Sequence, residues 1–317
     1  MMKIAMHCND LCVRGVPTSV FKYSEYLEQL FNYDIICLYD KTNKFNDEYG
    51  VNKFSKRFKT FGYQNWLEVD GILSKENVDM LYMQKGGDYD NKITYLVPTV
   101  IHAVFQMHQP HGNVYAYISE WLSKTMPGNH DFVPYIVDMI NPNDDYKNQF
   151  NIPKDALVFG RLGGYEEFNL PFVHKAIYDI AKSHNDIFFI FMNTKPFCEP
   201  LDNIIHMEKS IDEQVKSNFI NTCDAMIHAR TMGESFGLAV AEFLYQDKPV
   251  ISYHGGIDQN HMLMLNDKGM WYNDYASIMD KILNFNRLPD GEYKNIVDKF
   301  RYKNVMTKFK RVFIDNL

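Results

Sequence analysis

Short apolar runs alternate with amphipathic stretches along most of the chain. Continuous apolar runs predict buried strands, and apolar residues recurring every three or four positions predict helices. In the first half these patterns predict strands over 3–7, 34–39, 80–83, 99–105 and 115–119, and helices over 18–31 and 66–74. In the second half they predict strands over 156–160, 186–192, 225–228 and 249–252, and helices over 171–183, 211–221 and 237–245. Such alternation is typical of parallel α/β sheets.

The chain divides at the polar, turn-rich segment 141–145 (NPNDD), which is suited to a hinge. A length of 317 residues corresponds to two domains at roughly 150 residues each. We therefore expect an α/β fold of two doubly wound domains facing across a cleft. In such sheets ligands bind at the carboxyl ends of the strands.

Composition narrows the classes of function. The chain carries 33 basic and 40 acidic residues, a net charge of −7, which disfavours a general nucleic-acid binder. No apolar run reaches the roughly 18 residues of a membrane-spanning helix, and no secretory leader is evident. The five cysteines are scattered without metal-ligand spacing, as expected for reduced thiols in a cytoplasmic protein.

Two glutamates, Glu234 and Glu242, stand eight residues apart around the start of the predicted helix 237–245. A carboxylate in the loop and another inside the helix can reach two hydroxyl-bearing parts of one ligand. Gly233 and Gly237 allow close approach of the backbone, and a helix N-terminus favours an anion. Taken alone, the pair is better explained by helix capping and exposure to solvent than by ligand binding.

The context of these glutamates is more specific. The segments that matter, in chain order, are 99–102 (TVIH), 159–162 (FGRL), 228–242 with its Glu–seven residues–Glu spacing, 248–251 (KPVI) and Gly255-Gly256. Together they resemble the donor site of GT-B glycosyltransferases, especially those of family 4. The resemblance implies two Rossmann-like domains, 1–140 on the acceptor side and 141–293 for the nucleotide-sugar. It also implies that the C-terminal helix, about 294–317, packs back on the first domain.

By this resemblance, Glu234 faces the hydroxyls of the transferred sugar near its reacting carbon. Glu242 accepts hydrogen bonds from the ribose, and Arg161 neutralises the diphosphate with its fork of donors. His102 contacts the sugar from the opposite domain. The remaining donor-binding residues implied by the motif are Ser235, Phe236, Gly237, Gly255 and Gly256. Family 4 enzymes retain anomeric configuration and need no metal, so the nucleotide-sugar is the only small-molecule co-substrate implied.

One departure from the family concerns the diphosphate. A lysine usually follows the G-R-L segment by about six residues, whereas Glu166 and Glu167 occupy that region here. Backbone amides of Gly163 and Gly164, or the side chain of Lys195, are candidates to compensate. Either the phosphate site has been rebuilt or donor binding has decayed.

The acceptor side is harder to interpret. Gly15, in the turn after the first strand, and His108 are candidates to line it, although a plain turn glycine and a polar loop histidine explain them equally well. The acceptor itself is open between a glycan, a glycoprotein and a lipid. Base recognition is expected near 205–209. The segment 294–311 carries seven Lys or Arg against one acid, and a basic amphipathic helix of this kind can also contact an anionic membrane.

The sequence thus predicts a glycosyltransferase that transfers a hexose or pentose from a nucleotide-sugar to an acceptor hydroxyl. Two alternatives stay open. A non-catalytic or decayed nucleotide- or glycan-binding protein of the same fold would explain the missing lysine, and a nucleotide-sugar epimerase would share the architecture. An NAD-dependent enzyme is disfavoured because no G-x-G-x-x-G follows the first strand.

Overall fold

A computed structural model describes residues 1–12, 14–210, 212–287, 289 and 291–317. The chain forms two compact units. Unit 1 comprises Met1–Ile136 together with Phe300–Leu317, and unit 2 comprises Val137–Lys299. The end of the chain thus belongs to unit 1. Ile211, at the start of the predicted helix 211–221, and Val13, in the loop after the first strand, lie outside the described residues.

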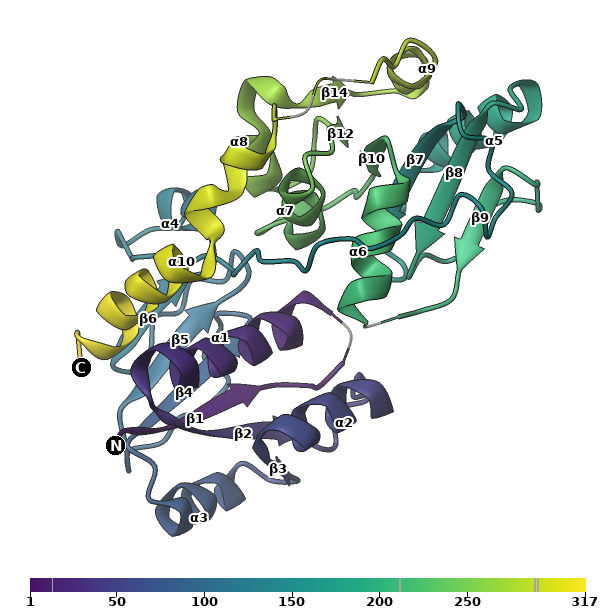
Figure 1. Ribbon diagram of the computed structural model, residues 1–317. Helices are drawn as coiled ribbons and strands as arrows, with labels where there is room; N and C mark the ends of the chain where they lie inside the picture. The colour runs from purple at the N-terminus through teal and green to yellow at the C-terminus, as the bar shows by residue number, and fades with distance from the viewer. Residues whose placement is uncertain (13, 211, 288, 290) are drawn as a thin grey trace. The chain divides into compact units, whose positions relative to one another are not determined.

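Unit 1 contains a parallel six-stranded sheet with strand order β3-β2-β1-β4-β5-β6 (Figure 1). Its strands are β1 (Lys3–Cys8), β2 (Asp34–Asp40), β3 (Lys59–Tyr63), β4 (Met80–Lys85), β5 (Thr99–Ala103) and β6 (Val114–Tyr117). Its helical segments are α1 (Gly15–Phe31), α2 (Glu48–Arg57), α3 (Leu67–Glu76), α4 (Glu120–Thr125), α10 (Tyr302–Phe309) and η3 (Lys310–Ile314). Right-handed parallel crossovers in this order are the doubly wound arrangement.

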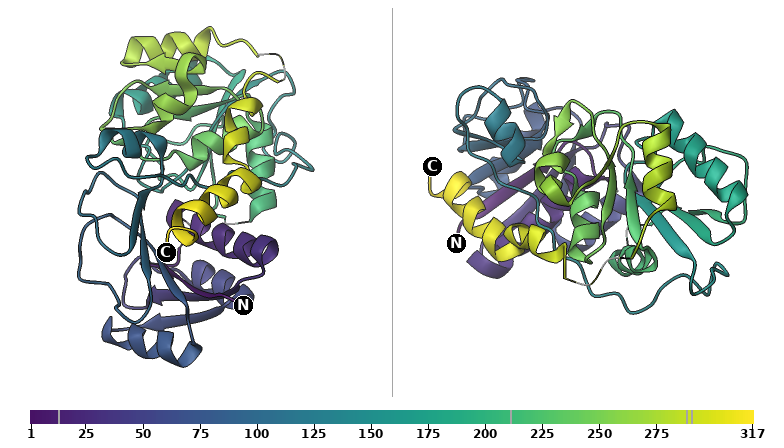
Figure 2. Two further views of the ribbon diagram at one scale, coloured as in Figure 1. Left: turned by 90° about the vertical axis from the view of Figure 1, so that its left-hand side faces the viewer. Right: turned by 90° about the horizontal axis from the view of Figure 1, so that it is seen from above.

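The last helix completes the core of unit 1. Figures 1 and 2 show α10 alongside α1. The rings of Tyr26 and Tyr302 stack with centroids 4.6 Å apart, and Tyr23 contacts Phe309 at 5.1 Å. Val305, Met306, Phe309, Val312 and Phe313 are buried. The apolar face of the basic tail therefore packs within unit 1.

Unit 2 repeats the same topology with strand order β14-β12-β10-β7-β8-β9. Its strands are β7 (Leu157–Leu162), β8 (Ile187–Met192), β9 (Ile204–Met207), β10 (Ala225–His228), β12 (Val250–Tyr253) and β14 (Met270–Tyr272), with a separate short pair, β11 (Gly233–Glu234) and β13 (Asp258–Gln259). Its helical segments are α5 (Pro171–Ser183), α6 (Glu213–Thr222), α7 (Leu238–Tyr245), α8 (Asn260–Leu265), η1 (Asn266–Lys268), α9 (Tyr275–Leu283) and η2 (Lys294–Phe300), whose last residue lies in unit 1.

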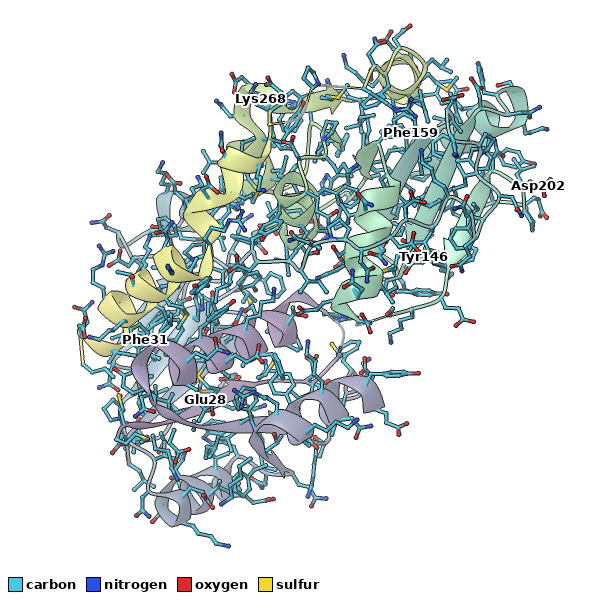
Figure 3. The ribbon with its side chains drawn as sticks, in the orientation of Figure 1. Glu28, Phe31, Tyr146, Phe159, Asp202 and Lys268 are labelled. Carbon is cyan, nitrogen blue, oxygen red and sulfur yellow. The ribbon has the colours of Figure 1, made fainter. Side chains whose placement is uncertain are left out.

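The core of unit 2 lies on both faces of β7 and β8. Every residue of β8 is buried, because helices cover both faces of a parallel sheet and no polar alternation is needed. Phe159 on β7, labelled in Figure 3, is fully buried and stacks with Phe189 at 5.8 Å. These central strands hold the two neighbouring loops of the site at fixed positions.

The predicted fold class is confirmed as α/β with two doubly wound, parallel sheets. Each strand and helix assigned from the apolar pattern is present within a few residues. The segment 41–64, to which no element was assigned, contains α2 and β3, and the segment 205–209, where base recognition is expected, begins inside β9. Within the described part of the chain, no helix is long and apolar enough to cross a membrane.

Candidate functional site

The predicted donor-site residues of unit 2 come from loops that follow β7, β8, β10 and β12, with one residue from α7. Because parallel strands end at the same edge of a sheet, these loops lie at a common edge (Figure 1). Direct contacts join them. The amide of Lys195, after β8, donates to the carbonyl of Tyr165, after β7, at 2.9 Å. The amide of Thr231, after β10, donates to Asn169 Oδ1 at 2.8 Å.

Arg161 lies near the end of β7 with its guanidinium buried. Nη1 donates to Thr194 Oγ1 at 2.6 Å and to the carbonyl of Asn193 at 3.2 Å, and Nη2 donates to the carbonyl of Gly164 at 2.8 Å. Burial lowers the pKa of Arg161 to about 10, so it remains a cation at neutral pH. Three neutral acceptors therefore hold a positive charge that no direct ion pair neutralises among the described residues.

The loop after β7 is shaped around this arginine. Gly163 has φ +155°, and a Cβ there would lie 2.8 Å from Arg161 Nη2, so a larger residue would displace the guanidinium. Gly164 uses its carbonyl to hold the same group. The side chain of Lys195 is exposed nearby. The two glycines thus position Arg161, and their predicted role as amide donors to a phosphate stays a prediction, as does the role of Lys195.

Glu234, in the loop after β10, is held by two basic side chains. Its Oε2 accepts from Arg230 Nη1 at 2.8 Å, and its Oε1 pairs with His228 Nε2 at 3.2 Å. Burial opposes ionisation, but His228 and Arg230 outweigh it and lower the pKa of Glu234 to about 2. The side chain is 20% exposed. Glu234 is therefore a fixed, partly accessible carboxylate that can accept hydrogen bonds from ligand hydroxyls.

Two histidines lie next to Glu234: His228 bonds to it directly, and His261 packs against His228. His228 pairs through Nδ1 with Ser252 Oγ at 3.0 Å, and since the carboxylate only accepts, its Nε2 carries the proton toward Glu234. His261 lies against His228, with ring centroids 4.7 Å apart. Neither ring nitrogen of His261 makes a hydrogen bond of normal geometry with the described residues, and burial lowers its pKa to about 3. It packs as a neutral ring.

Glu242 lies inside α7 and is almost fully buried. Its Oε1 pairs with Lys216 Nζ, on α6, at 2.6 Å. The predicted ribose acceptor is thus already bound to a cation on one oxygen, which fixes its orientation. Phe236 is buried before α7, Ser235 is half-buried beside it, and Gly237, at φ +90°, precedes the first residue of the helix.

The Gly-Gly loop packs directly on the Glu234 loop. Gly256 has φ +102°, and a Cβ there would lie 2.5 Å from the amide nitrogen of Gly233. The short strands β11 and β13 pair at Gly233 with Asp258 and at Glu234 with Gln259. Gly255 lies against the ring of Tyr253. The structure therefore brings Gly255 and Gly256 to Glu234, as the motif implies.

The candidates in unit 1 lie in a different setting. His102 is fully buried in β5, where Nδ1 pairs with Tyr82 Oη at 2.6 Å and Nε2 with the carbonyl of Val133 at 2.9 Å. Burial lowers its pKa to about 3. In this conformation His102 packs in the core of unit 1 and is fully buried, and its contact with the sugar stays a prediction.

The two acceptor-side candidates are accessible. His108 Nδ1 pairs with Tyr117 Oη at 2.8 Å, and its ring lies 5.4 Å from that of His130. Gly15 is the first residue of α1 and is half-buried. Both lie in unit 1. Their roles toward an acceptor stay predictions.

Sequence reasoning missed the residues that hold the two glutamates. His228 and Arg230 lie within the matched segment but received no role, and Lys216 and His261 were not considered. The available signal was spacing: Arg230 precedes Glu234 by four residues, and His228 precedes it by six. No described group of three or more His, Cys, Asp or Glu side chains is arranged to hold a metal ion.

No protein-family model matches the chain, and no curated protein matches it in sequence. Solved structures match it in fold. A sucrose-phosphate synthase from Thermosynechococcus elongatus has a TM-score of 0.74 at 11% identity, covering 99% of both chains. A glycosyltransferase from Rickettsia africae gives 0.69 at 12% identity, covering 99% of this chain and 98% of the other.

Two further matches were solved with nucleotide. Anabaena HepE with UDP and glucose has a TM-score of 0.69 at 12% identity, covering 99% of this chain and 96% of the other. S. aureus MnaA with UDP has a TM-score of 0.65 at 12% identity, covering 100% and 98%. Identities this low establish similarity of fold. The chain therefore has the GT-B fold, with two Rossmann-like units of the kind found in glycosyltransferases.

Proposed function

We propose that the protein is a glycosyltransferase that moves a sugar from a nucleoside diphosphate sugar to an acceptor hydroxyl, with retention of configuration and without a metal. The observation that carries the proposal is the convergence of Arg161, Glu234 and the Gly255-Gly256 loop at the carboxyl edge of the sheet in unit 2. The fold supports it, because similar structures include glycosyltransferases and complexes with UDP. The shared fold alone does not specify the reaction.

The charges at this edge suit each part of such a donor. Arg161 offers a fixed cation to the diphosphate, and Glu234 offers an ionised carboxylate to the sugar hydroxyls. Glu242 offers its second oxygen to the ribose, beside Lys216. The N-terminus of α7 adds backbone N–H groups and a positive dipole end toward an anion.

In the reaction we propose, the bond between the anomeric carbon and the β-phosphate oxygen breaks while the acceptor oxygen bonds to that carbon on the same face. The acceptor proton passes to the departing phosphate oxygen, which accounts for the reaction without a separate general base. Arg161 stabilises the charge that develops on this phosphate, and Glu234 keeps the sugar in place. The sugar is a hexose or a pentose, and the acceptor is a glycan, a glycoprotein or a lipid.

One observation favours a second candidate, a protein that binds nucleotide without turnover. Glu167 occupies the region where a lysine would favour the diphosphate, and its carboxylate lies 3.0 Å from Arg230. The same fold occurs in S. aureus MnaA, whose structure was solved with UDP. Binding and turnover therefore have to be measured separately.

The test is a thermal-shift screen with nucleoside diphosphates and their sugars, followed by hydrolysis and transfer assays on each ligand that binds. A ligand that binds the native state raises the unfolding midpoint with its concentration over Kd. We expect one nucleotide-sugar to shift the midpoint and to be turned over. A shift without turnover supports the binding protein, and no shift at millimolar concentration overturns both proposals.

A further inference from the structure

The Arg230 side chain occupies the point where the loops after β7 and β10 meet. Nη1 lies 2.8 Å from Glu234 Oε2 and Nη2 lies 3.0 Å from Glu167 Oε1, so one guanidinium bridges two carboxylates. Glu167 belongs to the acidic segment that replaces the family's lysine. Glu167, which stands in the loop after β7 where the family has a lysine, thus contacts Arg230 from the loop after β10.

Arg161 and Arg230 both contact the loop after β7. The carbonyl of Gly164 accepts from Arg161 Nη2 at 2.8 Å and from the amide of Glu167 at 3.1 Å, and the carboxylate of Glu167 pairs with Arg230. Arg230 accordingly acts to lower the pKa of Arg161, whereas Glu167 and Glu234 act to raise it. Two guanidiniums at one loop suit a dianion, because each can present a planar fork to phosphate oxygens.

The two carboxylates on Arg230 differ in how firmly they are held. Glu234 is 20% exposed and is also bound by His228, whereas Glu167 is 43% exposed and forms an ion pair with Arg230 alone among the described residues. An ion pair as exposed as that of Glu167 contributes little to stability and exchanges readily. An incoming phosphate would therefore displace Glu167 and leave Glu234 in place.

We propose that Arg230 is the second cation of the diphosphate site and that Glu167 is an exchangeable counter-ion, which the β-phosphate of the donor displaces. This inference rests on the proposed function. Arg230 is bound to Glu234, the residue placed at the transferred sugar, and the β-phosphate is the one bonded to that sugar. Arg230 therefore meets the β-phosphate, and the missing lysine is replaced from the loop after β10.

The experiment measures the affinities of UDP and UMP for the full chain by calorimetry, with GDP/GMP and ADP/AMP as parallel pairs. For the pair that binds wild type, Arg230→Gln is expected to weaken the diphosphate roughly 10- to 100-fold, the effect of losing a charged hydrogen-bond partner, and the monophosphate less than about threefold. Glu167→Gln, which frees Arg230, is expected to strengthen the diphosphate about two- to fivefold.

Matched controls remove the same groups elsewhere in unit 2. Arg287→Gln breaks the pair with Asp224, which precedes β10 and lies at the opposite edge of the sheet, and Glu292→Gln breaks the exposed pair with Lys268. Neither is expected to alter nucleotide affinity. Arg230→Lys keeps the charge without the fork, and we expect it to restore part of the diphosphate affinity even if Arg230→Gln unfolds unit 2.

The outcomes separate this inference from the proposed function. If wild type binds no nucleoside diphosphate, the proposed function fails and this inference fails with it. If wild type binds a diphosphate, but Arg230→Gln and Arg230→Lys weaken di- and monophosphate equally, Arg230 has only a structural role and this inference alone is overturned. Unchanged or weaker diphosphate binding in Glu167→Gln contradicts the role of Glu167 as a displaceable counter-ion.

Discussion

Units 1 and 2 have the same strand order but place their polar residues differently. In unit 2 the charged groups lie at or beyond the ends of the strands, where Arg161 is held by neutral acceptors and Arg230 pairs with Glu234. In unit 1 the polar side chains His102 and Gln84 face one another within β5 and β4 and are bonded to tyrosines. The same scaffold therefore yields a closed network in one unit and an open charged site in the other.

The difference lies in how each group obtains its partners. His102 finds Tyr82 Oη and two backbone carbonyls inside the sheet, so it can remain neutral and buried. Glu234 stays ionised because its partners are basic side chains in the same loop region. His102 therefore packs inside unit 1, whereas Glu234, in the loop after β10, stays partly exposed.

The largest expected effect follows removal of the Glu234 charge. Glu234→Gln keeps the shape but loses the carboxylate that faces the sugar, and we expect sugar transfer to fall about 100- to 1000-fold, as for loss of one electrostatic contact to a transition state. Affinity for the nucleoside diphosphate should change far less. Steady-state kinetics and calorimetry check both, and full turnover in Glu234→Gln would refute its assignment.

A matching substitution in unit 1 tests the other half of the comparison. His102→Phe removes the partner of Tyr82 Oη in a fully buried network, so we expect a stability loss of about 1–3 kcal/mol. The kcat of the remaining folded protein should stay within about threefold. If denaturant unfolding were unchanged while kcat fell sharply, His102 would be a sugar contact, as the resemblance implies.

Lowering the pH should reduce the folding stability of unit 1 more than that of unit 2. Burial lowers the pKa values of His7 and His102 in unit 1, and of His261 in unit 2, to about 3. Their unfolded forms bind protons below about pH 6.5, so the stability is present above that pH and is lost as pH falls toward 3. Each histidine contributes a slope of about 1.4 kcal/mol per pH unit.

Hydrogen exchange between pH 7 and 5 resolves this difference by unit. Amides of β1 and β5 should lose protection more steeply than those of β10 and β12. Equal slopes in both units would show that their unfolding is coupled or that the histidines are not buried in solution.

The smallest expected effect concerns Glu242. If this carboxylate binds the ribose, wild type should prefer UDP to 2′-deoxy-UDP or 3′-deoxy-UDP, and Glu242→Gln should reduce the preference by up to about tenfold. Lys216→Met, which removes the partner of Glu242, separates loss of the ion pair from loss of the hydroxyl contact. If Glu242→Gln left the preference for UDP over its deoxy analogues unchanged, the ribose would bind elsewhere.

Much of the fold could be predicted because its central strands are strongly apolar. The segment 186–192 (DIFFIFM) predicts a central strand of a parallel sheet, because a run this apolar needs cover on both faces. The segment 41–64 was not assignable because α2 is polar and buries only Gly50 and Phe54. The start of α2 is marked only by its N-cap, where the Asp47 side chain accepts a hydrogen bond from the amide of Gly50. The strand β3 is a half-buried edge strand, so its apolar pattern is weak.

The site was predictable only for the residues that carry the motif. Arg161, Glu234 and the Gly255-Gly256 loop are brought to one edge as expected. The partners of these groups come from other strands, as with Thr194 for Arg161 and Lys216 for Glu242. Such contacts depend on the register of the folded sheet, and nothing in local spacing specifies them. Arg230 is the exception, because its position four residues before Glu234 was a local signal that the motif did not use.

The most direct test of the central claim, that the open site of unit 2 binds the donor, is hydrogen exchange measured with and without the nucleoside diphosphate that binds. We predict protection of segments 161–167, 229–238 and 254–259, with the strands of unit 1 unchanged. Protection confined to unit 1, or absent from the Arg161 and Glu234 loops at saturating ligand, would contradict the account.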